Sequence, residues 1–259
     1  MPPTEPDGAL TFARFAYPPN QLGYCGPDVQ DEILQRVDAR AGGPELRALA
    51  RGFEGAWPYL QLIAAGNGIG DPLDARVVEA YWIGNRLLDR VGTAMFADSL
   101  VHRFAPALRS GTDRDRLLDP LWRGGVPHHG FHVFGVYPWV GLLRSGAVDQ
   151  ALHVLDRCRV RWGRITELSE SQATVESRPL VWDGRHLELG APRAELASTA
   201  RAGYVLAPRL RVGEWCALHW DWVCEPLNRR RLDALRRYTR QQLDAVNSVR
   251  FPAPAAALA

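Results

Sequence analysis

Apolar residues recur at helical spacing through the first part of the chain. The clearest case is 28–40, where four apolar side chains would share one helix face: Val29, Ile33, Leu34 and Val37. Similar spacing predicts further helices over 57–65, 74–88, 91–108 and 149–157. This run of elements predicts that residues 1–157 form an α-helical domain.

Three segments of this first part lack such a pattern. Residues 1–26 are expected to be irregular, because Pro18 and Pro19 interrupt an aromatic stretch. Residues 111–127 are expected to form a loop with turns near Asp119-Pro120 and Gly124-Gly125. The pattern over 127–139 is mixed and favours neither helix nor strand.

The pattern changes after Cys158, where short alternating segments separated by turn residues replace the helical spacing. Strands are expected at five places: 164–170, 173–181, 187–189, 204–206 and 215–223. Asn228 is a suitable cap for a last helix over 229–246. The sequence therefore predicts an α+β protein, with a helical domain over 1–157 and a small β-barrel with a closing helix over 158–259.

Composition removes several classes of function. A net charge of +2 gives no electrostatic case for binding nucleic acid or an anionic membrane. All 31 basic residues are arginines, so lysine chemistry such as a Schiff base or a P-loop is excluded. No apolar run is long enough to cross a membrane, and residues 1–7 lack an export signal. With four cysteines, the chain is expected to be cytoplasmic with reduced thiols.

Cys158 is the first candidate for chemistry, because a thiolate is a soft ligand for iron and similar metals. Arg157, Arg159 and Arg161 flank it, and nearby positive charge favours the thiolate. On a strand, these arginines would lie on the face opposite Cys158, where they would meet an anionic fragment or only water. The alternative for Cys158 is a buried, inert thiol.

Histidines supply the other candidate ligands. His128 and His132 would share a helix face at i, i+4, and His129 and His132 would share one at i, i+3. A third ligand would come from elsewhere, for example from Cys25, whose thiolate a following helix N-terminus would favour. The alternative is a loop whose histidines make ordinary hydrogen bonds.

Two short motifs resemble the HypC/HupF family of hydrogenase assembly chaperones. Cys158-Arg159-Val160-Arg161-Trp162-Gly163-Arg164-Ile165 is similar to the family's Cys-x-x-x-Pro-Gly-x-Val, with Trp162 in place of the proline. Val212-Gly213-Glu214-Trp215-Cys216-Ala217-Leu218-His219 resembles its Val-Gly-Asp-x-Val-x-x-His. The resemblance covers 158–246 and implies a HypC-like, OB-like barrel. It also implies that Cys158 and His219 hold iron carrying cyanide and carbon monoxide, whereas the residues alone allow His219 to be a core histidine.

The whole chain also resembles an uncharacterised group of proteins associated with hydrogenase gene clusters. The likeness rests on three stretches: 18–27, 128–139 and His219-Trp220-Asp221-Trp222. It implies the same pathway without implying a mechanism.

Three functions follow as hypotheses. The first is an accessory factor in nickel–iron hydrogenase maturation, which holds or transfers Fe(CN)₂(CO) or docks maturation proteins or the hydrogenase large subunit. The second is a metal-dependent enzyme of the same pathway, for example one that forms the carbon monoxide ligand with His128 and His132. The third is a docking module without metal or catalysis. None of them involves nucleic acid or a membrane.

Overall fold

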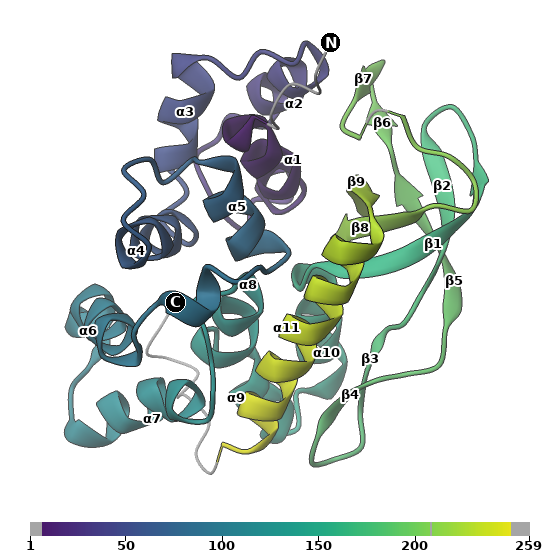
Figure 1. Ribbon diagram of the computed structural model, residues 1–259. Helices are drawn as coiled ribbons and strands as arrows, with labels where there is room; N and C mark the ends of the chain where they lie inside the picture. Colours follow the sequence, from purple (N-terminus) through teal and green to yellow (C-terminus); the bar gives the residue numbers. More distant parts are fainter. Residues whose placement is uncertain (1–6, 208, 250–259) are drawn as a thin grey trace.

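The computed structural model describes residues 7–207 and 209–249. Ten helices precede the strands and one follows them in this part of the chain (Figure 1). The helices are α1 (Gly8–Gln21), α2 (Gln30–Asp38), α3 (Pro44–Arg51), α4 (Trp57–Gly66), α5 (Ala75–Trp82), α6 (Thr93–Phe104), α7 (Gly111–Trp122), α8 (His129–Phe131), α9 (Trp139–Arg144), α10 (Val148–Cys158) and α11 (Arg229–Asn247). Two 3₁₀ turns, η1 (Leu88–Arg90) and η2 (Ala105–Ala107), flank α6, and a π-helical turn, η3 (His132–Val136), follows α8.

Five strands form the main sheet, in the order β1-β2-β5-β9-β8, and β8 pairs back onto β1. The ring of pairings is completed by a single parallel pair, Ser198 with Trp222, between β5 and β9. Two short hairpins, β3–β4 and β6–β7, extend from the sheet. The strands are β1 (Arg161–Leu168), β2 (Gln172–Ser177), β3 (Leu180–Trp182), β4 (Leu187–Leu189), β5 (Arg193–Ser198), β6 (Ala200–Arg201), β7 (Tyr204–Val205), β8 (Trp215–His219) and β9 (Trp222–Leu227). The mixture of helices and strands is confirmed, whereas the HypC-like form of the barrel stays a prediction.

One hydrophobic core runs through both halves of the chain. It joins Phe12 and Phe15 of α1 to Trp162 of β1, Ala217 of β8 and Leu235 of α11. Figure 1 shows α11 passing between the helices and the sheet. The helices and the sheet are therefore packed together across residue 158, and the division into domains over 1–157 and 158–259 stays a prediction.

The expected irregular structure over 1–26 is wrong for its described part, because 8–21 is helix α1. Asp7 caps this helix by accepting hydrogen bonds from the backbone N–H groups of Ala9 and Leu10. Most of α1 is buried on every side, so its sequence has no polar face and no helical period. Pro18 and Pro19 are accommodated inside the helix.

The expected loop over 111–127 is also wrong for most of its length, because α7 occupies 111–122. Ser110 caps it by accepting a hydrogen bond from the N–H of Asp113 at 3.2 Å. The inward face carries Leu117, Leu118 and Leu121. A Ser-x-x-Asp pattern at 110–113 was the available signal for this helix start.

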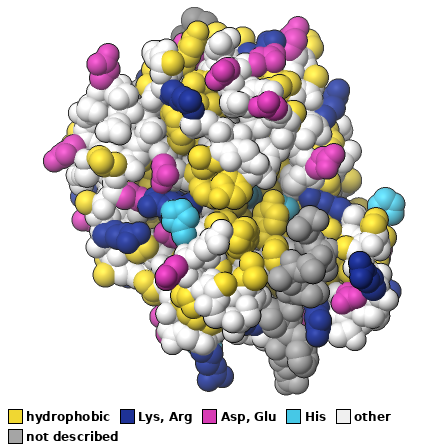
Figure 2. Space-filling model, turned by 180° about the vertical axis from the view of Figure 1, so that it is seen from behind, with side chains coloured by type: hydrophobic (Ala, Val, Ile, Leu, Met, Phe, Trp, Pro, Cys, Tyr) yellow, Lys and Arg dark blue, Asp and Glu magenta, His cyan; other side chains and the backbone are white. Residues whose placement is uncertain are grey.

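The surface offers few strong patterns. On the face seen in Figure 2, apolar side chains gather near the middle, and acidic and basic side chains are mixed around them. Among the described helices, none combines the length and the apolar character that crossing a bilayer requires. The expected lack of an export signal over 1–7 rests mainly on residues 1–6, which lie outside the described part.

Candidate metal centre

A cavity of about 190 Å³ lies where the helices meet the sheet. Its walls come from α1, α5, α8, α10 and the turn between β8 and β9, together with the segment after α1. Five of the predicted site residues line it: Cys25, His129, His132, Cys158 and His219. The remaining walls are mainly aromatic, and no acidic or basic residue lines the cavity besides histidine.

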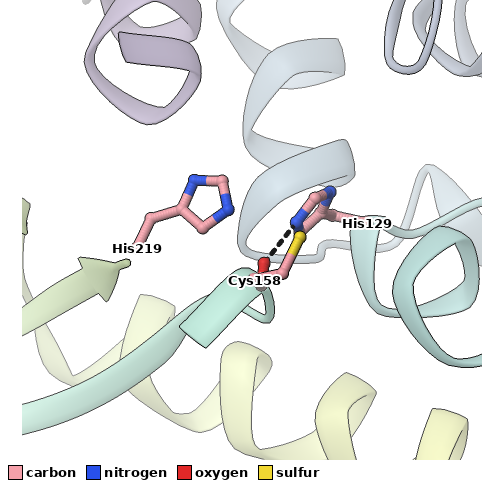
Figure 3. A group of neighbouring side chains, drawn as sticks. All are labelled: His129, Cys158 and His219. Atoms are coloured by element: carbon pink, nitrogen blue, oxygen red, sulfur yellow. Dashed lines mark hydrogen bonds between the residues drawn. The ribbon is translucent and has the colours of Figure 1, made fainter. Parts of the chain in front are cut away.

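Three of these residues are close enough to share one metal ion. One ligand atom each of His129, Cys158 and His219 lies within 4.8 Å of the other two. His129 begins α8, Cys158 ends α10 and His219 ends β8, so three separate elements bring their ends to one point (Figure 3). Both imidazoles are buried, and the Cys158 residue is partly buried.

The orientation of His219 is set by a carbonyl that α1 leaves free. The Nδ1 atom of His219 donates a hydrogen bond to the Phe15 carbonyl at 2.6 Å. In a regular helix this carbonyl would accept from residue 19, but Pro19 has no N–H. With its proton on Nδ1, His219 keeps the lone pair on Nε2, which is buried and has no hydrogen-bond partner. Metal-ligating histidines are held in this way.

His129 is held by two hydrogen bonds. Its Nε2 atom donates to the Cys158 carbonyl at 2.8 Å, and its Nδ1 atom accepts from the Tyr81 hydroxyl at 3.2 Å. The first bond ties the start of α8 to the end of α10 beside the thiol. To coordinate a metal through either ring nitrogen, His129 would have to give up one of these bonds.

Burial sets the protonation state of the site. Burial lowers the pKa of His129 to about 4 and the pKa of His219 well below its usual value. Burial also raises the pKa of the Cys158 thiol far above its ordinary range and that of Cys25 to about 12. At neutral pH the imidazoles are therefore uncharged and ready to coordinate, while the thiols carry their protons.

The thiolate-favouring surroundings expected for Cys158 and Cys25 are absent. Cys158 ends a helix instead of lying on a strand, and Arg159 and Arg161 are buried in ion pairs with Asp156 and Glu195. Because these carboxylates neutralise both guanidinium charges, the two arginines do not favour a thiolate at Cys158. Cys25 lies five residues before α2, which begins at Gln30, and burial raises the pKa of its thiol.

The remaining histidines occupy different places. His132 lines the cavity against the rings of Tyr59 and Tyr137, and its buried Nδ1 has no hydrogen-bond partner. His128 does not line the cavity. Its Nδ1 caps α8 by accepting from the Gly130 N–H at 3.0 Å, and its ring stacks on Tyr238. The predicted pair at i, i+4 is therefore separated, and His129 and His132 are the two that reach the cavity.

Sequence reasoning missed the aromatic walls of the cavity. They include Tyr81, Trp82, Tyr137, Trp139 and Trp220. The indole N–H groups of Trp82 and Trp220 are buried without an acceptor. Trp220 has a φ of +50°, a conformation that bulky residues rarely adopt, and it stacks on Tyr24. The cluster of tryptophans around His219 was the only available signal, and it does not distinguish a cavity wall from an ordinary core.

The protonation states predict how metal binding depends on pH. Binding should release about one proton per zinc(II), because the Cys158 thiol must ionise while both imidazoles are already neutral. The apparent affinity should therefore rise about tenfold per pH unit around neutrality. Calorimetry in buffers of different ionisation enthalpy measures the released protons. A pH-independent affinity would contradict a thiolate ligand, and the Cys158→Ala variant should lose the dependence.

Comparison with known families gives one match, which covers nearly the whole chain. Residues 4–253 match a family of unknown function, DUF6390, so the protein belongs to that family. Comparisons with curated proteins and with solved structures gave no match.

Proposed function

We propose that this member of the DUF6390 family is an accessory factor of nickel–iron hydrogenase maturation that holds an iron fragment in its cavity. One observation carries the proposal: ligand atoms of His129, Cys158 and His219 converge within 4.8 Å at a largely buried site. The cargo would be iron carrying cyanide and carbon monoxide, Fe(CN)₂(CO). In this role the protein holds the fragment and passes it to a maturation protein or to the large subunit.

The donor set selects the kind of metal. A thiol and two imidazoles suit iron(II), zinc(II) or copper(I), whereas magnesium and calcium prefer carboxylate and carbonyl oxygens. No carboxylate lines the cavity, so hard cations lack their preferred ligands there. Cys25 and His132 line the same cavity and are available as further ligands.

The size of the cavity favours a metal that carries its own small ligands. A volume of about 190 Å³ exceeds what one bare ion and a water molecule require, since water takes up roughly 30 Å³ in the liquid. Aromatic walls would surround diatomic ligands without competing for the metal. The buried N–H groups of Trp82 and Trp220 are donors without acceptors in these walls.

The assignment to hydrogenase maturation rests on the resemblance to HypC/HupF. Cys158 and His219 occupy the matching motif positions, and these two residues belong to the converging group. Cys158 lies inside the chain at the end of α10, whereas the family cysteine is N-terminal. Cargo would therefore enter through the cavity instead of being held by a free chain end.

The test is to purify the protein anaerobically from cells that produce a nickel–iron hydrogenase, and to record its infrared spectrum and metal content. We expect iron with cyanide and carbonyl stretching bands, lost in Cys158→Ala and retained in Cys216→Ala. Cys216 is a matched control, because it is buried in β8 and does not line the cavity. Metal without these bands, lost in His132→Ala, would support the enzyme hypothesis instead. Protein without metal that still associates with maturation proteins would support the docking module.

A further inference from the structure

A second hollow, separate from the metal centre, is a large groove between the helices and the end of the sheet. It has a volume of about 1560 Å³ and lies between α1, α5 and η1 on one side and β9 and α11 on the other. Eight arginines and five acidic residues line it, and none of its lining residues also lines the metal cavity. So many guanidinium groups in one groove repel one another, and they need anions nearby to stabilise them.

Ion pairs within the protein account for several of these arginines. Arg230 and Arg231 both pair with Glu79, and Arg231 also pairs with Glu225. Arg237 pairs with Asp89. These pairs connect α11 to α5, η1 and β9, and they hold the two walls of the groove together.

Three arginines of the groove have no ion-pair partner in the part of the chain that the structure describes: Arg14, Arg86 and Arg90. Arg86 and Arg90 are exposed, whereas Arg14 is partly buried and its Nε atom has no hydrogen-bond partner. Burial lowers the pKa of Arg14, which reflects the cost of removing its charge from water. The Glu225 carboxylate offsets part of this cost without forming an ion pair with Arg14, so an anion bound in the groove would stabilise this guanidinium further.

We propose that this groove binds an acidic segment of a partner protein. Carboxylates match the paired N–H groups of a guanidinium, and three cations along one groove suit a ligand with several carboxylates. The volume exceeds the roughly 300–1,000 Å³ of ordinary small-molecule pockets, which favours an extended ligand.

Nucleic acid fits the groove less well than an acidic polypeptide. Asp74, Glu79 and Asp233 lie among the arginines and would repel a continuous phosphate backbone. The groove also has a single aromatic side chain, Tyr238, whereas single-stranded nucleic acid is bound by several stacking rings. A polypeptide can place neutral residues beside these acids and carboxylates beside the arginines.

The test uses a fluorescein-labelled oligoglutamate peptide and fluorescence anisotropy at low ionic strength. The double variant Arg86→Glu, Arg90→Glu should bind about tenfold more weakly or worse, because two attractions become repulsions. The control variant Arg114→Glu, Arg240→Glu makes the same change in net charge at exposed arginines outside the groove. It should bind like the original protein. Circular dichroism would check that both variants are folded.

Other results would overturn the proposal. They are absent binding of the peptide, an equal loss in both double variants, or tighter binding of an oligothymidylate that is lost in the groove variant. The last result would indicate a nucleic-acid site. Cys158→Ala should leave peptide binding unchanged, so failure of the groove proposal and failure of the metal proposal can be told apart.

Discussion

Cys158→Ala should bind iron(II) or zinc(II) about 100-fold more weakly than the original protein under anaerobic conditions. Structural zinc sites with four ligands contribute roughly 10–16 kcal/mol, so one ligand accounts for about 3 kcal/mol. Cys158 should contribute at least this share, because the cavity offers no carboxylate that could replace it. Competition with a chelator of known affinity measures the loss. Cobalt(II) gives a second reading, because its thiolate-to-metal absorption should disappear in the variant.

Cys216→Ala is the matched control for this experiment. Cys216 is also a free cysteine, but it is fully buried and packs inside the sheet with Val175 and Val223. Its removal should leave metal affinity unchanged. If Cys158→Ala bound metal as tightly as the original protein, or if the two variants lost affinity equally, Cys158 would not be a ligand.

The position of Cys158 could be anticipated because it stands at a boundary between elements. The pattern changes from helix to strand at Cys158, whereas His219 falls inside the strand expected over 215–223 and only the structure shows that β8 ends there. Ends of elements meet where layers of structure join, and here both ends line one cavity. The convergence itself could not be predicted, since it depends on how α8, α10 and β8 pack across the core.

The protonation of the site could not be predicted from neighbours in the sequence. Arg159 and Arg161 suggest a positive field around Cys158, but their guanidinium groups are buried and paired with Asp156 and Glu195. Glu195 is distant in the sequence, so only the fold shows that these charges are compensated. Burial is therefore the main influence on the Cys158 thiol, and it raises the pKa of that thiol.

Helix α1 could not be predicted from local sequence either, as the Phe15 carbonyl shows. Two adjacent prolines suggested that no helix would form, because each removes a backbone donor. In the folded protein the carbonyl left without a donor by Pro19 accepts from His219. A local break in hydrogen bonding is thus satisfied by a side chain from β8, and no local pattern contains that information.

Glu195→Gln should lower the free energy of unfolding by about 3 kcal/mol, because it leaves Arg161 buried beside a neutral partner. Glu195 forms ion pairs with Arg161 at 3.1 Å and with Arg157 at 2.5 Å, and only 1% of the Arg161 side chain is exposed. For a chain of this size the melting temperature should fall by about 6–12 °C. Urea or thermal unfolding measures the change. Glu32→Gln, which removes a surface ion pair with Arg36, should cost only about 0.5 kcal/mol.

The loss of stability caused by Glu195→Gln should depend on pH. Burial opposes ionisation of Glu195, but Arg161, a hydrogen bond from Ser177 and Arg157 outweigh it, so its pKa lies below the ordinary value. A carboxyl with a lowered pKa stabilises the fold above its unfolded pKa of about 4.3 and loses this contribution as the pH falls. The difference between Glu195→Gln and the original protein should therefore be full at neutral pH and shrink in acid. A constant difference down to pH values well below about 4 would contradict the assignment.

Glu195→Gln should also weaken metal binding, although Glu195 does not line the cavity. Arg161 donates to the carbonyls of Asp156 and Trp220, and the backbone N–H of Trp220 donates to the Arg157 carbonyl at 2.8 Å. These bonds join the chain around Cys158 to the turn that follows His219. Partners that orient ligands typically account for about 10- to 100-fold in metal affinity. A variant that lost stability but kept full affinity would show that the network holds the fold without positioning the two ligands.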